Sequence, residues 1–256
     1  MVIRRIREHV AAQNWFAVGI DFLIVVAGVF LGMQVNNWNQ ARVEDEQARD
    51  YRRRLISELD FNARQFAEQA HYYRQVRANG TAALTALEDS SVPGADVLVH
   101  AYQLSQMDEA PPKAYIYQEM AASGLVSRLG DEQVQDVASD YYLNIDASGP
   151  TMTRMSPYRE LIRALIPASV QSLIRQRCGD RFVTYKDRIV GLSLVDDCHI
   201  ALDPALATSA AREIREWPGM HREMTRYVAL TQERIDTIDL NRELTNEFME
   251  HLGKAR

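Results

Sequence analysis

The chain has 256 residues, of which 46% are hydrophobic and 25% are charged. This balance is typical of a folded globular protein and excludes a chain that is mainly disordered. The formal net charge is −6 and no basic face stands out beyond Arg52–Arg54, so the composition also argues against nucleic acid as a partner.

The first predicted element is a transmembrane helix over residues 15–35, which reads FAVGIDFLIVVAGVFLGMQV after Trp15. About 20 mostly apolar residues, each rising about 1.5 Å, cross a hydrocarbon core of about 30 Å. A cleaved signal peptide is the alternative, but the apolar stretch is longer than usual and residues 36–40 offer no small-x-small cleavage site. Trp15 and Trp38 stand at the two ends, where indole rings prefer the headgroup level, and are predicted interface anchors.

The flanking charges favour a cytoplasmic N-terminus. Residues 1–14 carry Arg4, Arg5 and Arg7, whereas residues 42–50 mix two arginines with four acids. The excess of positive charge before the helix predicts that residues 1–14 are cytoplasmic and the rest of the chain extracytoplasmic. The arginines at 52–54 lie just beyond this flank and leave the reverse orientation open.

Two features inside the predicted membrane helix go beyond anchoring. Asp21 is its one charged residue, and a carboxylate there indicates a contact with a neighbouring helix, a proton or ion pathway, or a side chain that reaches the nearby interface. Gly28 and Gly32 form a small-xxx-small pair that lets a partner helix approach closely, although glycine is common in membrane helices. We predict helix packing through this pair.

Residues 36–80 are predicted to continue as a long stalk helix. No proline or glycine occurs from Asn39 to Asn79, and apolar residues recur at helical spacing at positions 51, 55, 59, 66, 73 and 76. Charged residues such as Glu58 and Arg64 fill the other faces and are expected to be solvated. Gly80 is the predicted end, with a further helical turn or two at 81–87.

The middle of the chain predicts shorter helices between turn signals. Helices are expected near 95–107, at 114–127 and at 131–143. The run Ala147-Ser148-Gly149-Pro150 is expected to break the chain. Residues 157–177 are helical again, with Pro167 as a kink or a boundary.

The only β-structure predicted is a hairpin near 181–195, with strands near 181–185 and 189–195 around Lys186-Asp187. Cys178 and Cys198 fall at opposite ends of these strands, and we predict a disulfide, which would persist in an oxidising compartment. Two unpaired buried thiols in a cytosolic domain are the alternative. A metal site formed by Asp196, Asp197, Cys198 and His199 is disfavoured, because consecutive strand residues point to alternate faces.

The C-terminal part predicts helices from about residue 205 to 252, interrupted at Pro218-Gly219. One apolar stripe follows this segment, formed by Met220, Met224, Tyr227, Thr231, Ile235, Ile238, Thr245, Phe248 and Leu252. Its simplest partner is the stalk helix, packed antiparallel, although trimeric or tetrameric packing between subunits stays open. The predicted fold is mainly α, an antiparallel helical bundle with one hairpin, in which residues 81–256 form the extracytoplasmic domain.

No catalytic, cofactor or metal motif is found. The six histidines lie outside any HExxH frame, and the glycines form neither a GxGxxG motif nor a P-loop. The acidic pairs Asp108-Glu109 and Asp196-Asp197 are interpreted as solvated loop charges. Tyrosines at 72, 73, 115, 117, 141 and 142 could line a ligand cavity, but are more often packing residues. We therefore expect no enzyme and no cofactor.

The segment QNWFAVGIDFLIVVAGVFLGMQVNNWN resembles the opening of a family of uncharacterised bacterial inner-membrane proteins with an N-terminal anchor and a helical C-terminal domain. A second block, residues 117–125 followed by Tyr141-Tyr142, is similar to another part of that family. The resemblance implies a single-pass protein of the bacterial inner membrane. It supplies no catalytic residues.

The functional prediction is a structural or accessory protein that acts through protein contacts in the inner membrane and periplasm. Its expected partners are the lipid bilayer and, through the membrane helix, a second copy or another membrane protein. One alternative is a proton- or ion-coupled subunit that uses Asp21. A helical periplasmic ligand-binding module is the second alternative.

Overall fold

The structure is a computed structural model that describes residues 15–254, except for the side chains of Trp15 and Ala17. The predictions for residues 1–14, including the basic cluster at Arg4, Arg5 and Arg7, lie outside the described residues. The chain divides into two compact units with the boundary between Asp50 and Tyr51, and each is described separately.

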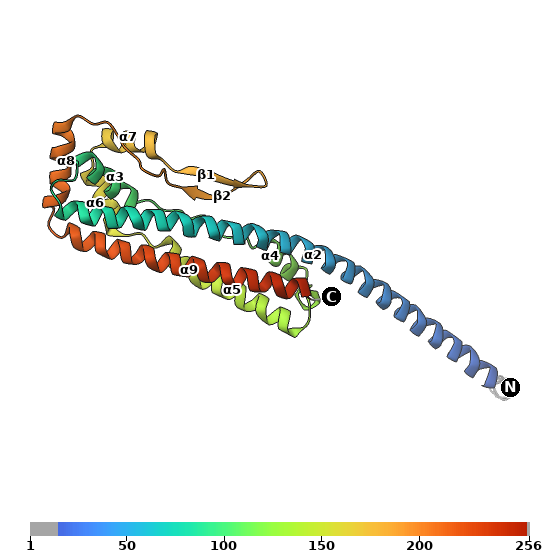
Figure 1. The fold of residues 1–256 in the computed structure, drawn as a ribbon. Coiled ribbons are helices and arrows are strands. Elements are labelled where there is room, and N and C mark those ends of the chain that lie inside the picture. The colour runs from blue at the N-terminus through green and yellow to red at the C-terminus, as the bar shows by residue number, and fades with distance from the viewer. Residues whose placement is uncertain (1–14, 255–256) are drawn as a thin grey trace, which may run out of the picture. The chain divides into compact units, whose positions relative to one another are not determined.

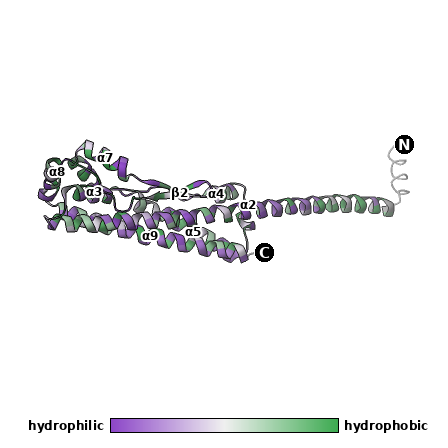
Figure 2. Cartoon of the chain, turned by 45° about the horizontal axis from the view of Figure 1, so that its top comes forward, coloured by the Kyte–Doolittle hydropathy of each residue, from purple (hydrophilic) through white to green (hydrophobic). Residues whose placement is uncertain are grey.

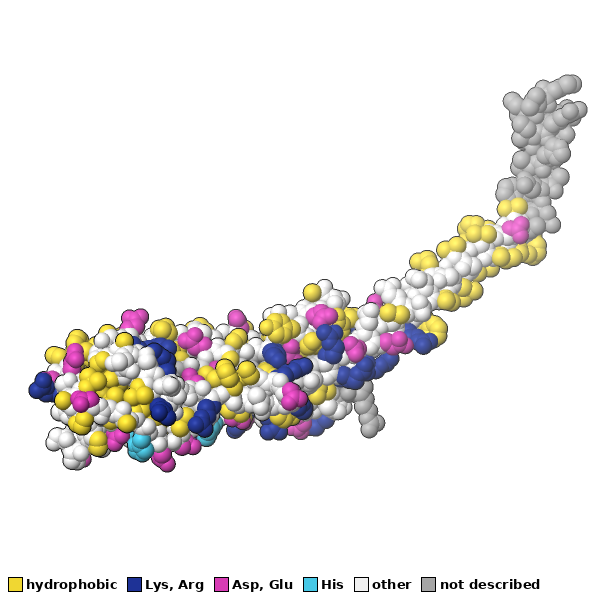
Figure 3. Space-filling view, turned by 90° about the horizontal axis from the view of Figure 1, so that it is seen from above, with side chains coloured by type: hydrophobic (Ala, Val, Ile, Leu, Met, Phe, Trp, Pro, Cys, Tyr) yellow, Lys and Arg dark blue, Asp and Glu magenta, His cyan; other side chains and the backbone are white. Residues whose placement is uncertain are grey.

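The first unit is the N-terminal part of helix α2 (Trp15–Glu88). Hydrophobic residues run along it (Figure 2), and their side chains are exposed on the helix surface (Figure 3). Near its end Arg42 and Glu46 form an ion pair one turn apart, at 3.2 Å. This part of α2 is long and apolar enough to cross a membrane, as the sequence predicts.

The second unit is built on two long antiparallel helices, the rest of α2 and α9 (Met220–Lys254), which lie side by side (Figure 1). Leu55 of α2 shares a buried cluster with Leu252 of α9. Farther along α2, the Arg74 guanidinium pairs with the Asp239 carboxylate. Residue numbers that increase along α2 therefore meet residue numbers that decrease along α9. The predicted antiparallel packing is thus confirmed within one chain.

The predicted apolar stripe of α9 is confirmed. All nine of its residues, from Met220 to Leu252, are at most 4% exposed. On α2, five of the six predicted core positions, 55, 59, 66, 73 and 76, are also buried, and Tyr51 is partly buried. The amphipathic period thus predicts which faces of the two helices meet.

Three further elements complete the bundle near Leu55. Helix α5 (Glu132–Thr153) packs along α9, while α4 (Tyr115–Ala122) and the short 3₁₀ helix η1 (Val126–Arg128) precede it in the chain. Asp131 begins α5 by accepting a hydrogen bond from the Val134 amide, a typical N-cap. Met120, Leu129 and Tyr141 of this region share the buried cluster with Leu55.

Four short helices cover the other end of the bundle: α3 (Gly94–Leu104), α6 (Pro157–Leu165), α7 (Ala168–Cys178) and α8 (Pro204–Glu216). Helices α6 and α8 begin with a proline preceded by a capping side chain, Ser156 and Asp203 respectively. Pro167 lies between α6 and α7, so it is a helix boundary and not a kink.

The predicted hairpin is confirmed as strands β1 (Arg181–Tyr185) and β2 (Arg188–Ser193), paired antiparallel. The two turn residues, Lys186 and Asp187, have φ angles of 48° and 60°, as the tight turns between twisted strands require. Gly191 lies against α2, where a Cβ atom would come 2.8 Å from the Cβ of Glu68.

Two predicted helix breaks are wrong. Gly80 lies inside α2, and a Cβ atom there would be 2.6 Å from a methyl group of Val228, so this glycine permits close packing with α9. Pro150 lies inside α5, which continues to Thr153 because contacts with α9 hold its last turn. In one of these contacts the Asn241 amide donates to the Ser148 hydroxyl at 3.0 Å.

Candidate functional site

The residues predicted for the membrane helix belong to α2, and those whose side chains the structure describes are exposed. Asp21, Gly28 and Gly32 are exposed, Trp38 is 69% exposed, and Trp15 begins the helix. A Cβ atom at either glycine would have no heavy atom within 4 Å, which leaves this face open to another helix. No polar partner of Asp21 occurs among the described residues.

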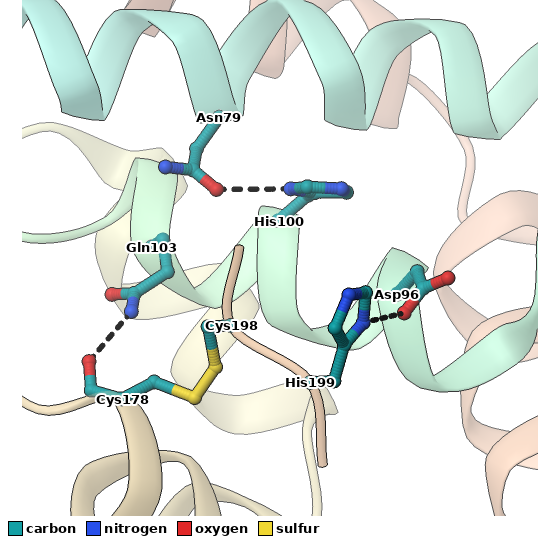
Figure 4. Close-up of a disulfide and its surroundings, with 7 residues drawn as sticks. All are labelled: Asn79, Asp96, His100, Gln103, Cys178, Cys198 and His199. Carbon is teal, nitrogen blue, oxygen red and sulfur yellow. Dashed lines mark hydrogen bonds and ion pairs between the residues drawn. A yellow bond between two sulfur atoms is a disulfide. The ribbon is translucent and has the colours of Figure 1, made fainter. Parts of the chain in front are cut away.

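The predicted bond between Cys178 and Cys198 is present and joins the end of α7 to the segment after β2 (Figure 4). The two Cα atoms are 5.7 Å apart. Cys178 is 1% exposed, and its carbonyl oxygen accepts a hydrogen bond from the Gln103 amide at 2.7 Å. The bond therefore fastens the hairpin and its flanks to the bundle.

An open cleft of 360 Å³ lies beside the disulfide, between α2, α3 and residues 194–199. It brings together two histidines that are 99 positions apart in the sequence, His100 and His199. The imidazole of His100 lies beside Asn79, and that of His199 beside Asp96 (Figure 4). Sequence reasoning missed this pairing, because neither histidine belongs to a local motif.

The hydrogen bonds fix the tautomer of His100. The Asn79 amide nitrogen donates to the Gln75 carbonyl oxygen at 3.0 Å, so the other atom of this amide, Oδ1, faces His100. Oδ1 lies 2.9 Å from His100 Nδ1 and can only accept a hydrogen bond, so Nδ1 carries the hydrogen. Burial lowers the pKa of His100, and the charge of Asp96 opposes this shift. The neutral ring therefore presents Nε2 as an acceptor.

Two histidines and three aspartates line the cleft beside the disulfide. No serine or threonine lines it, and its cysteine is held in the disulfide. Within residues 15–254 no group of three or more histidine, cysteine or acidic side chains has a geometry that could hold a metal ion. Asp196 instead accepts a hydrogen bond from the Gln75 amide at 3.0 Å, and Asp197 has a φ of 47°, as in a turn.

A second site, which the sequence did not predict, is a ladder of buried polar side chains on α2. We call residues 105–114, which join α3 to α4, the connector. Along one face of α2, Asn62, Gln65, Gln69 and Tyr73 are each at most 4% exposed. Each makes hydrogen bonds to backbone groups of the connector. Their spacing of three or four residues places all four on a single helical face.

Asn62 and Tyr73, the two ends of the ladder, each donate a hydrogen bond to one connector residue and accept another from it. At one end, Asn62 donates to the Lys113 carbonyl at 2.8 Å and accepts from the Lys113 amide at 2.9 Å. Between the ends, Gln65 donates to the carbonyls of Ala110 and Pro111. These bonds satisfy backbone groups in a proline-containing segment that forms no helix or strand. The ladder therefore fixes the path of the connector on the bundle.

Two acids near the ladder, Asp108 and Glu58, are less solvated than the sequence suggested. Asp108 is 4% exposed, not a solvated loop charge, and its Oδ2 has no hydrogen-bond partner. Burial raises the pKa of Asp108 and also that of Asp180, whose Oδ1 accepts from the Tyr72 hydroxyl at 3.2 Å. Glu58, predicted on a solvated face of α2, is likewise buried at 7% exposure.

The predicted tyrosines pack mainly on one another. Tyr117 stacks on Tyr142 with ring centroids 3.9 Å apart, and Tyr141 meets Tyr142 edge-on. Tyr72 and Tyr73 also meet edge-on. Tyr115 differs, since it is 70% exposed and lines a cleft that also contains Lys113 and Arg188.

No family model, curated protein or solved structure matches this chain. The roles of the residues above therefore rest on their geometry alone. The resemblance of residues 13–39 to the openings of bacterial inner-membrane proteins stays a prediction.

Proposed function

We propose that this chain is a single-pass protein of the bacterial inner membrane whose helical second unit lies in the periplasm and acts there through protein contacts. The N-terminus is cytoplasmic in this proposal. The protein serves as a structural or accessory subunit and does not catalyse a reaction.

The exposure of the apolar segment is the observation that carries this proposal. From Phe16 to Val35 the large hydrophobic side chains are between 44% and 76% exposed. Apolar surface in water costs about 25 cal/mol per Å², so a continuous exposed stretch of this length favours a lipid surrounding. The disulfide supports an extracytoplasmic second unit, because such bonds persist in oxidising compartments.

A reporter fused after Arg256 tests the topology. An alkaline phosphatase fusion, which folds only outside the cytoplasm, should be active, and a fluorescent protein that matures only inside should stay dark. Extraction at alkaline pH should leave the chain in the membrane. The opposite reporter pattern would overturn the proposed orientation, and release into the soluble fraction would overturn the anchor.

A second candidate function uses Asp21 as a proton- or ion-coupling group. Its support is one carboxylate in an otherwise uncharged stretch, where acids are costly and usually functional. Asp21→Asn keeps the size of the side chain and removes its charge. If coupling is the function, this variant assembles with its partner but does not complement a deletion strain.

Matched variants separate coupling from packing. Gly28→Leu together with Gly32→Leu fills the small-residue face without changing any charge. In the accessory-subunit proposal this pair weakens assembly, whereas Asp21→Asn leaves complementation intact. Complementation is measured in the deletion strain, and assembly by co-purification from the membrane fraction.

A further inference from the structure

A cleft of 330 Å³ opens where the hairpin turn meets α2 and the start of α4. Its lining includes Glu58, Phe61, Lys113, Tyr115, Ile116 and Arg188. We call it the hairpin-turn cleft. Its volume lies at the lower end of the range of small-ligand sites, about 300 to 1,000 Å³.

Two cations, Lys113 and Arg188, line the hairpin-turn cleft. The ammonium group of Lys113 lies 3.3 Å from the ring centroid of Phe61, and the ladder bonds from Asn62 fix its backbone. Burial lowers the pKa of Lys113 and the positive charge of Arg188 lowers it further, whereas the negative charge of Glu58 opposes this shift. Neither Lys113 nor Arg188 forms an ion pair with a described carboxylate.

Two other cations differ in this respect, Arg54, which also lines the cleft, and Lys186 in the hairpin turn. Arg54 pairs with Glu119 at 2.6 Å, and Lys186 pairs with Asp60 at 3.0 Å. Lys113 and Arg188 therefore repel each other, and Glu58 is the one carboxylate of the cleft lining that opposes this repulsion. An anion bound between them would relieve that cost and form charge-assisted hydrogen bonds.

Glu58 provides a hydrogen-bond acceptor in the same cleft. Its Oε2 accepts from the backbone amide of Ile116 at 3.2 Å, near the start of α4. Its Oε1 is buried and has no donor within reach among the described residues. A buried oxygen without a partner costs about 1 to 3 kcal/mol, so a ligand that donates an N–H there gains affinity.

Apolar side chains form the remaining wall. Phe61 is 9% exposed at the floor, and Tyr115 is 70% exposed at the rim. Aromatic rings at such positions bind an apolar side chain of moderate size. The hairpin-turn cleft thus combines an anion site, an acceptor and an apolar surface.

A phosphate group fits this combination poorly. A phosphate would gain from Lys113 and Arg188, and its O–H can donate to Glu58, but it carries no apolar group to pack on the aromatic side chains. The last residue of a peptide carries a single negative charge, an adjacent amide N–H and a side chain. These three groups match the three parts of the cleft.

We propose that the hairpin-turn cleft binds the free C-terminus of a peptide, with the carboxylate at Lys113 and Arg188, the last amide N–H at Glu58, and an apolar last side chain against Tyr115 and Phe61. The inference rests on the proposed function in one respect, since it takes the peptide to be the end of a partner protein. Capture of terminal carboxylates is a known mode of peptide recognition.

Calorimetric titration of the full chain in detergent micelles tests this assignment. The probe is acetyl-Ala-Ala-Leu with a free carboxylate, compared with the same peptide as its C-terminal amide. The free acid should bind at least about tenfold more tightly, the value of one charge-assisted hydrogen bond. A third peptide, N-methylated at the last amide, should also bind about tenfold more weakly, because it cannot donate to Glu58.

Three variants complete the test. Lys113→Gln and Arg188→Gln should each remove most of the preference for the free acid. Arg226→Gln, which removes a cation on α9 that pairs with Glu223, should bind like the wild type. Circular dichroism checks that each variant is folded before titration.

Several results would overturn the proposal. These are equal binding of the acid and the amide, unchanged binding by both cleft variants, and binding of free leucine or inorganic phosphate as tightly as the peptide. The titration uses purified protein and does not depend on orientation in the membrane. Its failure is therefore distinct from a failure of the reporter experiment.

Discussion

The hydroxyl of Tyr73 and the backbone of Asp108 exchange two hydrogen bonds. The hydroxyl donates to the Asp108 carbonyl at 2.9 Å and accepts from the Asp108 amide at 3.1 Å. Tyr73 is fully buried, so one side chain satisfies both backbone groups of a residue that belongs to no helix or strand. With the amides of Asn62, Gln65 and Gln69, it holds the connector against α2.

Tyr73→Phe should lower the free energy of unfolding by about 1 to 3 kcal/mol, because it leaves two backbone groups of Asp108 without a partner. The ring keeps its packing, so the loss reports the hydroxyl alone. The measurement is a denaturant titration followed by circular dichroism. Tyr115→Phe is the control, since its ring is 70% exposed, and a similar loss in both variants would contradict the role given to the ladder.

Arg234 holds the end of α5 on α9. It is fully buried, and its guanidinium donates to the carbonyls of Thr151 and Arg154 and to the Tyr227 hydroxyl. Carbonyls at a helix C-terminus lack helical partners and carry partial negative charge. These three hydrogen bonds explain how the guanidinium of Arg234 is buried without an ion pair to a described carboxylate.

Arg234→Met should therefore destabilise the second unit by about 2 to 4 kcal/mol, because two helix-end carbonyls lose their donors. Arg234→Lys should recover part of this loss, since a single ammonium cannot reach all three acceptors. Denaturant titration gives both values. Arg226→Met, an exposed change on the same helix, should stay within about 0.5 kcal/mol of the wild type, and an equal effect at both sites would reject the account.

The stability of the second unit should depend on pH through Asp108. Burial raises the pKa of its carboxyl above the ordinary value of 3.8, and the neighbouring charge of Glu109 adds to the rise. The folded chain then holds a proton that the unfolded chain has lost. The contribution of Asp108 is therefore most favourable below pH 3.8 and declines as the pH rises through its folded pKa.

Asp108→Asn removes this titration. The difference in unfolding free energy between the variant and the wild type should shift in favour of the variant as the pH rises from about 4 to about 7. Denaturant titrations across that range measure it, and a difference that is constant with pH would contradict the expectation. Asp140→Asn, which removes an exposed carboxylate on α5, controls for the change in net charge.

The helical period of the sequence predicts how the two long helices pack, because each buries one apolar face on the other. It fails at Gly80 and Pro150, where local propensity favours a helix end but packing against α9 favours continuation. In the interior of a helix, glycine is less favourable than alanine by about 1 kcal/mol and proline by about 3 kcal/mol. The packing energy of contacts along a long helix interface exceeds these penalties. Such contacts are not visible in a local stretch of sequence.

The polar sites were less predictable than the packing. Glu58 is predicted on a solvated face but is buried, and no prediction concerns Asn62 or Gln65, since nothing in the sequence shows that the connector covers this part of α2. The available signal is weak: amide side chains at helical spacing, together with a later proline pair at 111–112 that forms neither helix nor strand. In contrast, Cys178 and Cys198 were predictable because a short hairpin between them brings their positions together.

The disulfide should contribute about 3 kcal/mol to the stability of the second unit, since it closes a loop between cysteines 20 positions apart. Adding reductant should shift the denaturant midpoint of the wild type to that of a Cys178→Ser, Cys198→Ser double variant. The double variant itself should not respond to reductant. A thiol assay on the unfolded wild type should find no free thiol before reduction.

The same bond links stability to location. Chain made in the periplasm should migrate faster on a non-reducing gel than after reduction, because the closed loop keeps the denatured chain compact. Chain made without residues 1–35, and therefore retained in the reducing cytoplasm, should show one mobility under both conditions. If the full chain in membranes also shows only the reduced mobility, the second unit does not face an oxidising compartment, and the orientation proposed here is wrong.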